Sequence, residues 1–281
     1  MKLKIFLISL LISMPFWWEM DVFSKNLEVF LFKNQILTAE VSQKIITEQT
    51  ELLKSERERR EYLENLKIDA KAAISVEIKD KNQERILFEK NSQEPLPIAS
   101  LTKLMTALII FDLTETYDFS QPISITKSVG DLLFIMLIES SNDAALALTE
   151  PIGEEGFVDL MNLYAKDIGL KDTLFVDSTG LDPGNISSVR DLVILARYII
   201  DNYPQIFEIT IHQQYGTTTN TNKLLAEVPG IIGGKTGWTI EAGGCLLLVL
   251  ENPNGSGYFI NIILGSDDRF GEMRQLINAI K

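Results

Sequence analysis

The chain has 281 residues, 46% of them hydrophobic, which is enough apolar material for a folded domain and excludes intrinsic disorder of the whole chain. With 39 acidic and 26 basic side chains the net charge is −13, so a phosphate backbone is a poor ligand and we expect no nucleic-acid partner. The single Cys245 and the single His212 exclude a disulfide framework and a Cys- or His-rich metal centre, and we expect no metal and no cofactor.

The first 23 residues carry the features of an export segment. Two lysines precede an apolar run from Ile5 to Trp18, and two acidic residues follow it. The run is shorter than the roughly 20 residues of a full membrane span, yet no small-x-small cleavage site follows it. A cleaved signal peptide and an uncleaved anchor both remain open, with a slight preference for the anchor. Either one places the rest of the chain outside the cytoplasm.

Residues 24–70 are expected to form a helical stalk or linker. The stretch from Thr38 to Lys67 lacks Pro and Gly and is rich in Glu, Lys, Arg and Gln, which favour a helix. Its apolar stripe is thin and broken. A coiled-coil arm is the alternative, although Arg59 falls on the apolar seam and weakens it.

Residues 71–281 show strand patterns at both ends and helical patterns between them. Ala72 to Lys79 alternates as a half-buried strand, and Arg85 to Lys90 completes a hairpin. A long apolar helix follows from Ser100. The later elements are helices over 131–138, 143–150, 156–168 and 189–201, strands over 205–218, 231–238, 243–251 and 257–264, and a closing helix over 268–281. This order predicts an α+β fold, with an antiparallel sheet flanked by helices.

Three short motifs stand in order along this domain: S-x-x-K at Ser100–Lys103, S-x-N at Ser140–Asn142 and K-T-G at Lys235–Gly237. The first two are weak alone, because Ser124 begins a second S-x-x-K and Ser24 a second S-x-N. The context favours the copies at Ser100 and Ser140. Ser100 follows a proline-bearing loop and starts an apolar helix, whereas Ser24 lies in the membrane-proximal segment.

The S-x-x-K spacing suits a serine nucleophile with a lysine base. Positions i and i+3 share a helix face, so Lys103 can reach the Ser100 hydroxyl. Burial, or a second cation such as Lys235, would lower the lysine pKa. The alternative is that Ser100 only caps the helix and Lys103 is a solvated surface residue.

The other two motifs supply groups that can bind a peptide. A hydroxyl at Ser140 and a carboxamide at Asn142 can pass a proton and hold an amide, unless they only cap a helix before Asp143. K-T-G lies on a predicted edge strand, where Gly237 permits close approach of an extended peptide. The alternative for the glycines here is a bulge or a turn.

The chain resembles the serine D-alanyl-D-alanine carboxypeptidases, which are low-molecular-mass penicillin-binding proteins. The resemblance covers residues 72–281 and is collinear. It includes PIASLTKLMTAL around Ser100, SSNDAALAL from Ser140 and GGKTGWTIEAGGCLLLV from Gly233. It implies a β-lactamase/DD-peptidase-like α+β fold, in which an antiparallel sheet flanked by helices is joined by a helical subdomain.

The resemblance also implies roles for single residues. Ser100 would be the acylated nucleophile, Lys103 the general base and Ser140 a proton relay. The implied substrate-binding residues are Asn142, Lys235, Thr236, Gly237, Trp238 and Arg269. Among these, Thr236 and Arg269 would meet the substrate's terminal carboxylate, and the N–H groups of Ser100 and Trp238 would form the oxyanion hole.

The implied activity is removal of the terminal D-Ala from peptidoglycan stem pentapeptides through an acyl-enzyme, with β-lactam antibiotics as covalent inhibitors. A DD-endopeptidase acting on cross-links is the close alternative. A β-lactamase would need a separate acidic base, and no acidic residue with an Asn partner stands out between Glu150 and Leu181. An inactive cell-wall-binding module is disfavoured, because Ser100, Lys103 and Lys235 are all present.

Two departures from the family pattern concern the cleft wall and the membrane tether. Ser140 follows Ser100 by only 40 residues, and the chain looks trimmed near Thr126 to Asp131. We therefore expect a shortened helical subdomain and altered substrate selectivity. The chain given stops at Lys281 without the C-terminal β-rich domain and membrane helix of many members. We expect the N-terminal segment to tether the domain to the outer face of the cytoplasmic membrane.

Overall fold

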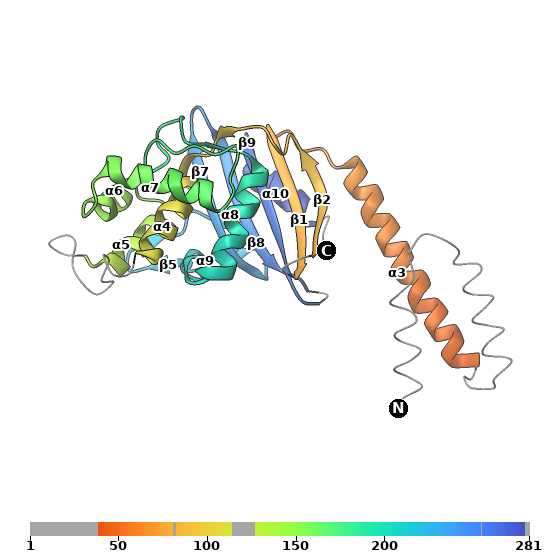
Figure 1. The fold of residues 1–281 in the computed structure, drawn as a ribbon. Helices are drawn as coiled ribbons and strands as arrows, with labels where there is room; N and C mark the ends of the chain where they lie inside the picture. The colour runs from red at the N-terminus through yellow and green to blue at the C-terminus, as the bar shows by residue number, and fades with distance from the viewer. Residues whose placement is uncertain (1–38, 81–82, 114–126, 254, 279–281) are drawn as a thin grey trace. The chain divides into compact units, whose positions relative to one another are not determined.

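The computed structural model describes residues 39–80, 83–113, 127–253 and 255–278 (Figure 1). The chain divides into two compact units, Met1–Glu61 and Tyr62–Lys281. The signal or anchor predicted over residues 1–23 lies outside the described residues. Within the described ranges, no helix combines the length and the apolar character needed to cross a membrane.

Helix α3, Ala39–Asn65, occupies most of the segment for which the sequence predicts a helix. Exposed pairs at i and i+4 join Lys44 to Glu48 at 3.9 Å and Lys54 to Glu58 at 3.8 Å. Such pairs contribute at most about 0.5 kcal/mol each. These two pairs therefore add little to the stability of the helix, and its role as a stalk stays a prediction.

A five-stranded antiparallel sheet in the order β2-β1-β9-β8-β7 forms the centre of the second unit. Its strands are β1 Ala72–Asp80, β2 Gln83–Lys90, β7 Ile231–Thr239, β8 Gly243–Glu251 and β9 Tyr258–Ser266. The hairpin β1-β2 forms as predicted, and β9 pairs beside β1, so the two ends of the domain meet within the sheet. Strand β7, which carries K-T-G, lies at an edge.

Both faces of the sheet are covered, as Figure 1 shows. Helices α8, Val189–Asn202, and α9, Gln205–Thr210, cross one face, and α10, Arg269–Asn278, lies behind the other. Alternate residues of β1 from Ile74 to Ile78 enter the larger core, on the side of the helical layer. The prediction that β1 is half-buried was wrong, because α10 covers its second face. Ser75 on that face is fully buried, and its hydroxyl donates to Asn261 Oδ1 at 2.7 Å.

Most of the described chain between β2 and β7 forms a helical layer. Its helices include η1 Ala99–Thr102, α4 Lys103–Asp112, α5 Val129–Ile138, α6 Asn142–Thr149, α7 Glu154–Asp167 and α8 Val189–Asn202. Within this layer, two short strands, β3 Leu96–Pro97 and β4 Ile186–Ser187, pair with each other in antiparallel orientation. The five-stranded antiparallel sheet, flanked by helices, confirms the predicted α+β class. Of the region expected to be trimmed, Thr126 to Asp131, only residue 126 lies outside the described residues; Ser128 caps α5, which begins at Val129. The shortened helical subdomain stays a prediction.

The strand predicted over residues 205–218 was wrong. Gln205–Thr210 is helix α9, with Pro204 at its N-cap, followed by a small hairpin of β5, Gln214–Tyr215, and β6, Thr218–Thr219. A short apolar run does not distinguish a strand from one and a half turns of buried helix. The buried side chains of α9 are spaced as on a helix face, at Ile206, Phe207, Ile209 and Thr210.

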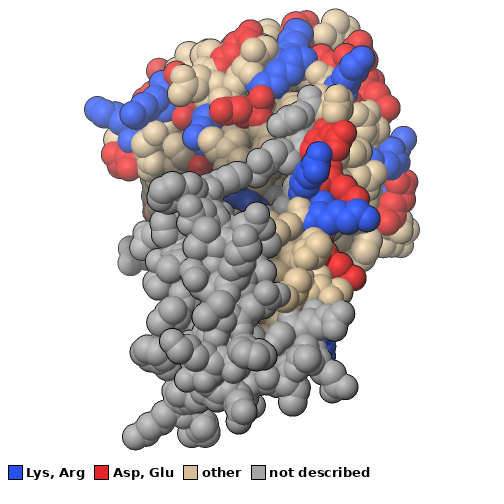
Figure 2. Space-filling view, turned by 90° about the vertical axis from the view of Figure 1, so that its right-hand side faces the viewer, with Lys and Arg blue, Asp and Glu red and all other residues tan. Residues whose placement is uncertain are grey.

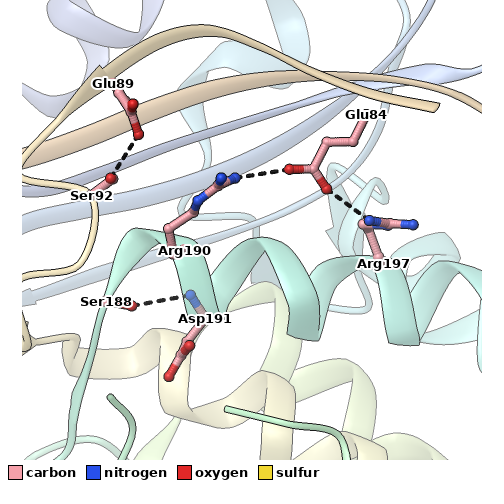
Figure 3. Close-up of polar contacts among 7 residues, drawn as sticks. All are labelled: Glu84, Glu89, Ser92, Ser188, Arg190, Asp191 and Arg197. Atoms are coloured by element: carbon pink, nitrogen blue, oxygen red, sulfur yellow. Dashed lines mark hydrogen bonds and ion pairs between the residues drawn. The ribbon is translucent and has the colours of Figure 1, made fainter. Parts of the chain in front are cut away.

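An ionic bridge ties the outer strand of the sheet to α8 (Figure 3). Glu84 on β2 accepts hydrogen bonds from Arg190 and Arg197, each at 2.8 Å, and the two arginines lie two turns apart on α8. Beside it, the Ser92 hydroxyl donates to Glu89 at 2.7 Å. The bridge joins β2, at one edge of the sheet, to α8, whereas β7, at the other edge, contacts η1.

Candidate active site

Ser100 lies in a tight turn rather than at the start of a long helix. It is the second residue of η1, whose N-cap is Ile98, and α4 begins only at Lys103. The Thr102 hydroxyl donates to the Ala99 carbonyl at 2.8 Å and closes the turn. Ala99 has φ 47°, an unfavourable conformation for a non-glycine residue. Ser100 is therefore not the helix cap considered as an alternative, and its half-buried hydroxyl remains available for chemistry.

Two glycines press against this turn from different segments. A Cβ at Gly237 of β7 would lie 3.0 Å from the Ser100 nitrogen and 3.0 Å from the Ile98 carbonyl oxygen. A Cβ at Gly180, where φ is +80°, would lie 2.0 Å from the Ala99 carbonyl oxygen. Only glycine allows such close approach of two main chains. The K-T-G strand thus lies directly against the turn that carries Ser100.

Lys103 is completely buried and contacts three oxygen atoms. Its Nζ lies 3.1 Å from Ser100 Oγ and 2.7 Å from Asn142 Oδ1, and it donates to the Thr179 carbonyl. A neutral amine has two hydrogens and one lone pair. The two carbonyl-type oxygens can only accept, so they take both hydrogens and leave the lone pair for the hydroxyl of Ser100.

The surroundings of Lys103 make it a weaker base than an exposed lysine. Burial lowers its pKa from 10.5 to about 7, although the nearby charge of Asp177 acts in the opposite direction. Much of the amine is therefore unprotonated near neutral pH. The predicted base thus has both a lone pair aimed at Ser100 and a pKa suited to proton transfer at neutral pH.

Ser140 and Lys235 form a second pair close to Lys103. Ser140 lies between α5 and α6 with φ 70°, and Lys235 Nζ donates to its Oγ at 2.7 Å and to the Thr236 carbonyl at 3.0 Å. Burial lowers the pKa of Lys235 well below its ordinary value, and the neighbouring charges of Lys103 and Arg269 lower it further. The cap of α6 is Ser141, so the capping alternative does not account for Ser140 or Asn142.

The predicted carboxylate-binding residues meet on the K-T-G strand. Thr236 Oγ1 lies 2.5 Å from Thr221 Oγ1, and Arg269 donates to the Gly237 carbonyl at 2.8 Å. The Nε of Arg269 is buried and finds no acceptor among the described residues. Trp238, the next residue on β7, is 62% exposed. The structure therefore joins Lys103 to Ser100 and Asn142 and joins Lys235 to Ser140. Arg269 bonds Gly237, which packs against Ser100, and Thr236 and Trp238 are the neighbours of Gly237 on β7.

Three residues that contact this group were not singled out from the sequence. Thr179 supplies the carbonyl on Lys103, Asp177 binds the loop around it, and Thr221 pairs with Thr236. The string Asp-Ser-Thr-Gly at 177–180 indicates a turn, because an Asp side chain often accepts hydrogen bonds from the backbone that follows it and Gly tolerates turn conformations. A backbone carbonyl, however, leaves no trace in the residue types.

Neither carboxylate near the site resembles an independent base. Asp177 accepts four hydrogen bonds from its own loop, and Glu154 accepts from the Thr149 hydroxyl and from the N–H and hydroxyl of Ser178. Their oxygens are thus occupied by protein donors. The part of the chain that the structure describes also holds no cluster of His, Cys, Asp and Glu that could bind a metal.

Comparisons with known proteins agree with this geometry. The family model described as D-alanyl-D-alanine carboxypeptidase, peptidase family S11, matches residues 59–129 and 122–267. The chain is 33% identical over 218 residues to the D-alanyl-D-alanine carboxypeptidase DacF of Bacillus subtilis, covering 66% of this chain and 55% of DacF. It is 34% identical over 206 residues to a D-alanyl-D-alanine endopeptidase of Pseudomonas aeruginosa, covering 63% of this chain and 66% of that protein. It thus spans between about half and two thirds of these relatives.

Solved structures are similar over the same region. Penicillin-binding protein D2 from Listeria monocytogenes, in the ampicillin-bound form, superimposes with a TM-score of 0.69 at 30% identity. That match covers 76% of this chain and 98% of the Listeria chain. PBP3 from Streptococcus pneumoniae, titled a peptidoglycan synthesis regulatory factor, gives a TM-score of 0.67 at 30% identity, with 76% and 69% covered.

Proposed function

The chain belongs to the D-alanyl-D-alanine carboxypeptidase family, and from that premise we propose that it is a serine DD-carboxypeptidase that trims peptidoglycan stem pentapeptides. The observation that carries the proposal is the hydrogen-bond pattern of Lys103. Its contacts with Asn142 and Thr179 leave its lone pair for the Ser100 hydroxyl. A serine activated in this way attacks the carbonyl of the terminal D-Ala-D-Ala peptide bond.

The reaction follows from the positions of the side chains. Lys103 takes the proton of Ser100 while Oγ bonds to the substrate carbonyl carbon. The developing oxyanion lies between the N–H groups of Ser100 and Trp238, and losing one such donor costs about 100- to 1000-fold in rate. Ser140, held by Lys235, passes a proton to the leaving D-Ala nitrogen. Water activated by Lys103 then hydrolyses the ester.

Substrate orientation would come from the K-T-G strand and its neighbours. An extended peptide can pair with the free edge of β7, as in β-augmentation. Asn142 presents its Oδ1 to Lys103, so its amide nitrogen is free to hold a substrate carbonyl. Thr236, Lys235 and Arg269 then supply a hydroxyl and two cationic groups for the terminal carboxylate.

β-Lactam antibiotics are proposed as covalent inhibitors at Ser100. The Listeria relatives are titled as ampicillin-bound and cefotaxime-bound forms, and both superimpose on this chain. A β-lactamase needs rapid deacylation by a separate acidic base, and two carboxylates near the site, Asp177 and Glu154, are already bound by protein donors. Slow turnover of the acyl-enzyme is therefore expected.

The place of action is proposed from the family and from the N-terminal sequence. Peptidoglycan is assembled outside the cytoplasmic membrane, so an enzyme that trims it acts on that side. The apolar segment within residues 1–23, whether a signal or an anchor, is consistent with export, and we propose that it tethers the domain.

DD-endopeptidase activity is the second candidate, because a relative with that name is 34% identical. Both reactions use the same nucleophile and differ in the substrate that the cleft admits. Incubation with a stem pentapeptide and, separately, with a cross-linked dimer separates them. Free D-Ala from the pentapeptide supports the carboxypeptidase, whereas cleavage of the dimer alone would replace it by the endopeptidase.

The decisive test compares the full-length protein with Ser100→Ala. We expect D-Ala release and fluorescent-penicillin labelling by the first and neither by the second. Ser124→Ala is the matched control, because Ser124 begins the second S-x-x-K of the chain. Loss of labelling in Ser124→Ala but not in Ser100→Ala would contradict the assignment, and an inactive wall-binding module would leave even the wild type unlabelled.

A further inference from the structure

The loop Asp177–Asp182 joins the helical layer to the nucleophile turn. Its Gly180 packs against the Ala99 carbonyl, and its Thr179 carbonyl accepts a hydrogen bond from Lys103. Nothing in the S-x-x-K, S-x-N or K-T-G motifs covers this loop. It nevertheless contacts both the residue before the nucleophile and the lysine that activates it.

One carboxylate organises the loop. Asp177 Oδ1 accepts the N–H groups of Thr179 and Gly180, each at 2.6 Å, and the Thr179 hydroxyl at 2.8 Å. Its Oδ2 accepts the N–H of Asp182 at 2.7 Å. Burial alone would raise the pKa of Asp177, but these hydrogen bonds lower it below its ordinary value. The carboxylate is therefore a fixed negative charge at neutral pH.

The loop is also held from its other side. Glu154 of α7 accepts from the Ser178 N–H at 2.8 Å and from the Ser178 hydroxyl at 3.0 Å. The Thr106 hydroxyl of α4 donates to the Ser178 carbonyl at 2.7 Å. Because these contacts do not involve Asp177, the position of the loop does not depend on that carboxylate alone. Its charge can accordingly be removed without removing every anchor.

Two ionisable groups from different elements act on Lys103. Lys235 on β7 is a second buried cationic group, and the charges of the two lysines oppose one another. Asp177 acts in the opposite sense and favours the protonated form of Lys103. Asn142, Ser100 and the Thr179 carbonyl, its remaining polar neighbours, carry no charge.

We propose that Asp177 is a positioning residue of the proton relay: it fixes the Thr179 carbonyl on Lys103 and stabilises the ammonium that forms when Lys103 deprotonates Ser100. The role of Asp177 is comparable to that of the carboxylate in a Ser-His-Asp triad, which orients the base and stabilises its protonated form. Here the carboxylate acts through one peptide unit rather than by direct contact.

The step balances without any further reactant. The Ser100 proton moves to Lys103 Nζ as the bond from Oγ to the substrate carbonyl carbon forms. The C–N bond of the scissile amide then breaks, a proton passes to the leaving nitrogen, and Lys103 becomes neutral again. Asp177 stays ionised throughout and exchanges no proton.

The proposal rests on the proposed function for its catalytic meaning, so its test has one measurement that is independent of activity. Lysine 13Cε resonances of the full-length protein are titrated by NMR, and the Lys103 signal is assigned from its absence in Lys103→Met. Asp177→Asn keeps an acceptor oxygen for the loop and removes the charge. Asp182→Asn is the matched control, because Asp182 is exposed in the same loop and bonds Gly184.

We expect Lys103 to titrate near pH 7 in the wild type. In Asp177→Asn we expect the midpoint to fall by about 0.5 to 1 pH unit, since removing an anion disfavours the ammonium. Asp182→Asn should leave it in place. An unchanged midpoint in Asp177→Asn, or an equal shift in Asp182→Asn, would overturn the proposal.

The second measurement is the rate of acylation by a fluorescent penicillin across pH 5 to 9. The rate rises with pH as Lys103 loses its proton, so in Asp177→Asn the acidic limb should move to lower pH by the same amount. The plateau should fall by about threefold, because the base is weaker. A uniform loss at every pH with no shift means that Asp177 is only structural and overturns the electrostatic role. A wild type that fails to label refutes the proposed function, while the NMR titration still decides on Asp177.

Discussion

Two buried lysines share the cleft, and burial lowers the pKa of each. Their contacts differ, and this difference divides the work between them. Lys103 meets two carbonyl-type oxygens and the nucleophile, whereas Lys235 meets the Ser140 hydroxyl and a carbonyl of its own strand. These contacts suit the proposed roles, in which Lys103 accepts a proton from Ser100 and Lys235 orients Ser140.

The close approach of β7 to the nucleophile turn gives a prediction for a single residue. In Gly237→Ala the new Cβ would lie 3.0 Å from the Ser100 nitrogen and 3.0 Å from the Ile98 oxygen, so the strand must shift by a few tenths of an ångström. Because the oxyanion hole needs donors within hydrogen-bond distance, penicillin acylation should slow by about 10- to 100-fold.

The control for this substitution is Gly255→Ala. A Cβ at Gly255 meets nothing within 4 Å, and its φ lies outside the left-handed region. This substitution adds the same methyl group in the connection between β8 and β9, without touching the site. Acylation by Gly237→Ala at the rate of Gly255→Ala would show that the contact at Ser100 is not needed.

The sequence predicts the site better than it predicts the geometry that makes the site work. Side chains of distinctive chemistry, such as Ser100 and Lys103, are readable because their types and spacing carry the signal. The Thr179 carbonyl is not readable, since every residue has one. The strain at Ala99 is equally invisible, because alanine has no preference for a positive φ.

At the scale of elements, the sequence predicts correctly the helices and strands whose hydrophobic pattern fits only one type of secondary structure. The strands β1, β7, β8 and β9 and the helix α8 follow the predicted ranges within a few residues. The stretch from Gln205 does not, because a six-residue apolar helix and a strand show similar patterns. The second face of β1 was also missed, since the sequence of a strand does not reveal that a distant helix, α10, covers it.

Helix α6 allows stability and chemistry to be separated at adjacent residues. Ser141 is its N-cap and accepts a hydrogen bond from the Ala144 N–H at 3.2 Å, whereas the hydroxyl of Ser140 accepts from Lys235. We expect Ser141→Ala to lower the free energy of unfolding by about 1 kcal/mol and to leave acylation within about threefold of wild type.

Ser140→Ala is the matched comparison and should behave in the opposite way. It removes the proposed proton relay, so D-Ala release should fall by about 100-fold, while the free energy of unfolding changes by less than about 1 kcal/mol. Urea unfolding and D-Ala release, measured on both variants, check the pair. A Ser140→Ala protein that is unstable but active would remove Ser140 from the mechanism.

At the scale of the whole molecule, acidic side chains outnumber basic ones by 39 to 26. Figure 2 shows acidic and basic side chains interspersed over the described part of one face. With a net charge of −13, the whole chain has no general attraction for a phosphate backbone. In the proposed mechanism, the basic groups that would meet an anionic substrate are Lys235 and Arg269, both at the K-T-G strand.

The last residues before β1 belong to the core of the second unit, although the sequence predicts that the domain begins at Lys71. Ile68 and Ala70 are 5% and 1% exposed and lie in the core beneath α10. The buried Glu272 of α10 accepts the N–H of Asp69 at 2.5 Å and of Ala70 at 2.9 Å. These contacts tie the entry of the domain to its closing helix.

Two truncations on either side of this segment give the last prediction. A protein starting at Tyr62 keeps the whole second unit and should fold and bind penicillin as the full chain does. One starting at Ala72 loses the burial of Ile68, worth about 1.5–3 kcal/mol, and leaves Glu272 without two of its donors, at about 1–3 kcal/mol. Urea unfolding should show a loss of about 3–5 kcal/mol between the two proteins. Equal stability would mean that α10 holds the sheet without the segment at Ile68–Ala70, and that the fold begins with β1 itself.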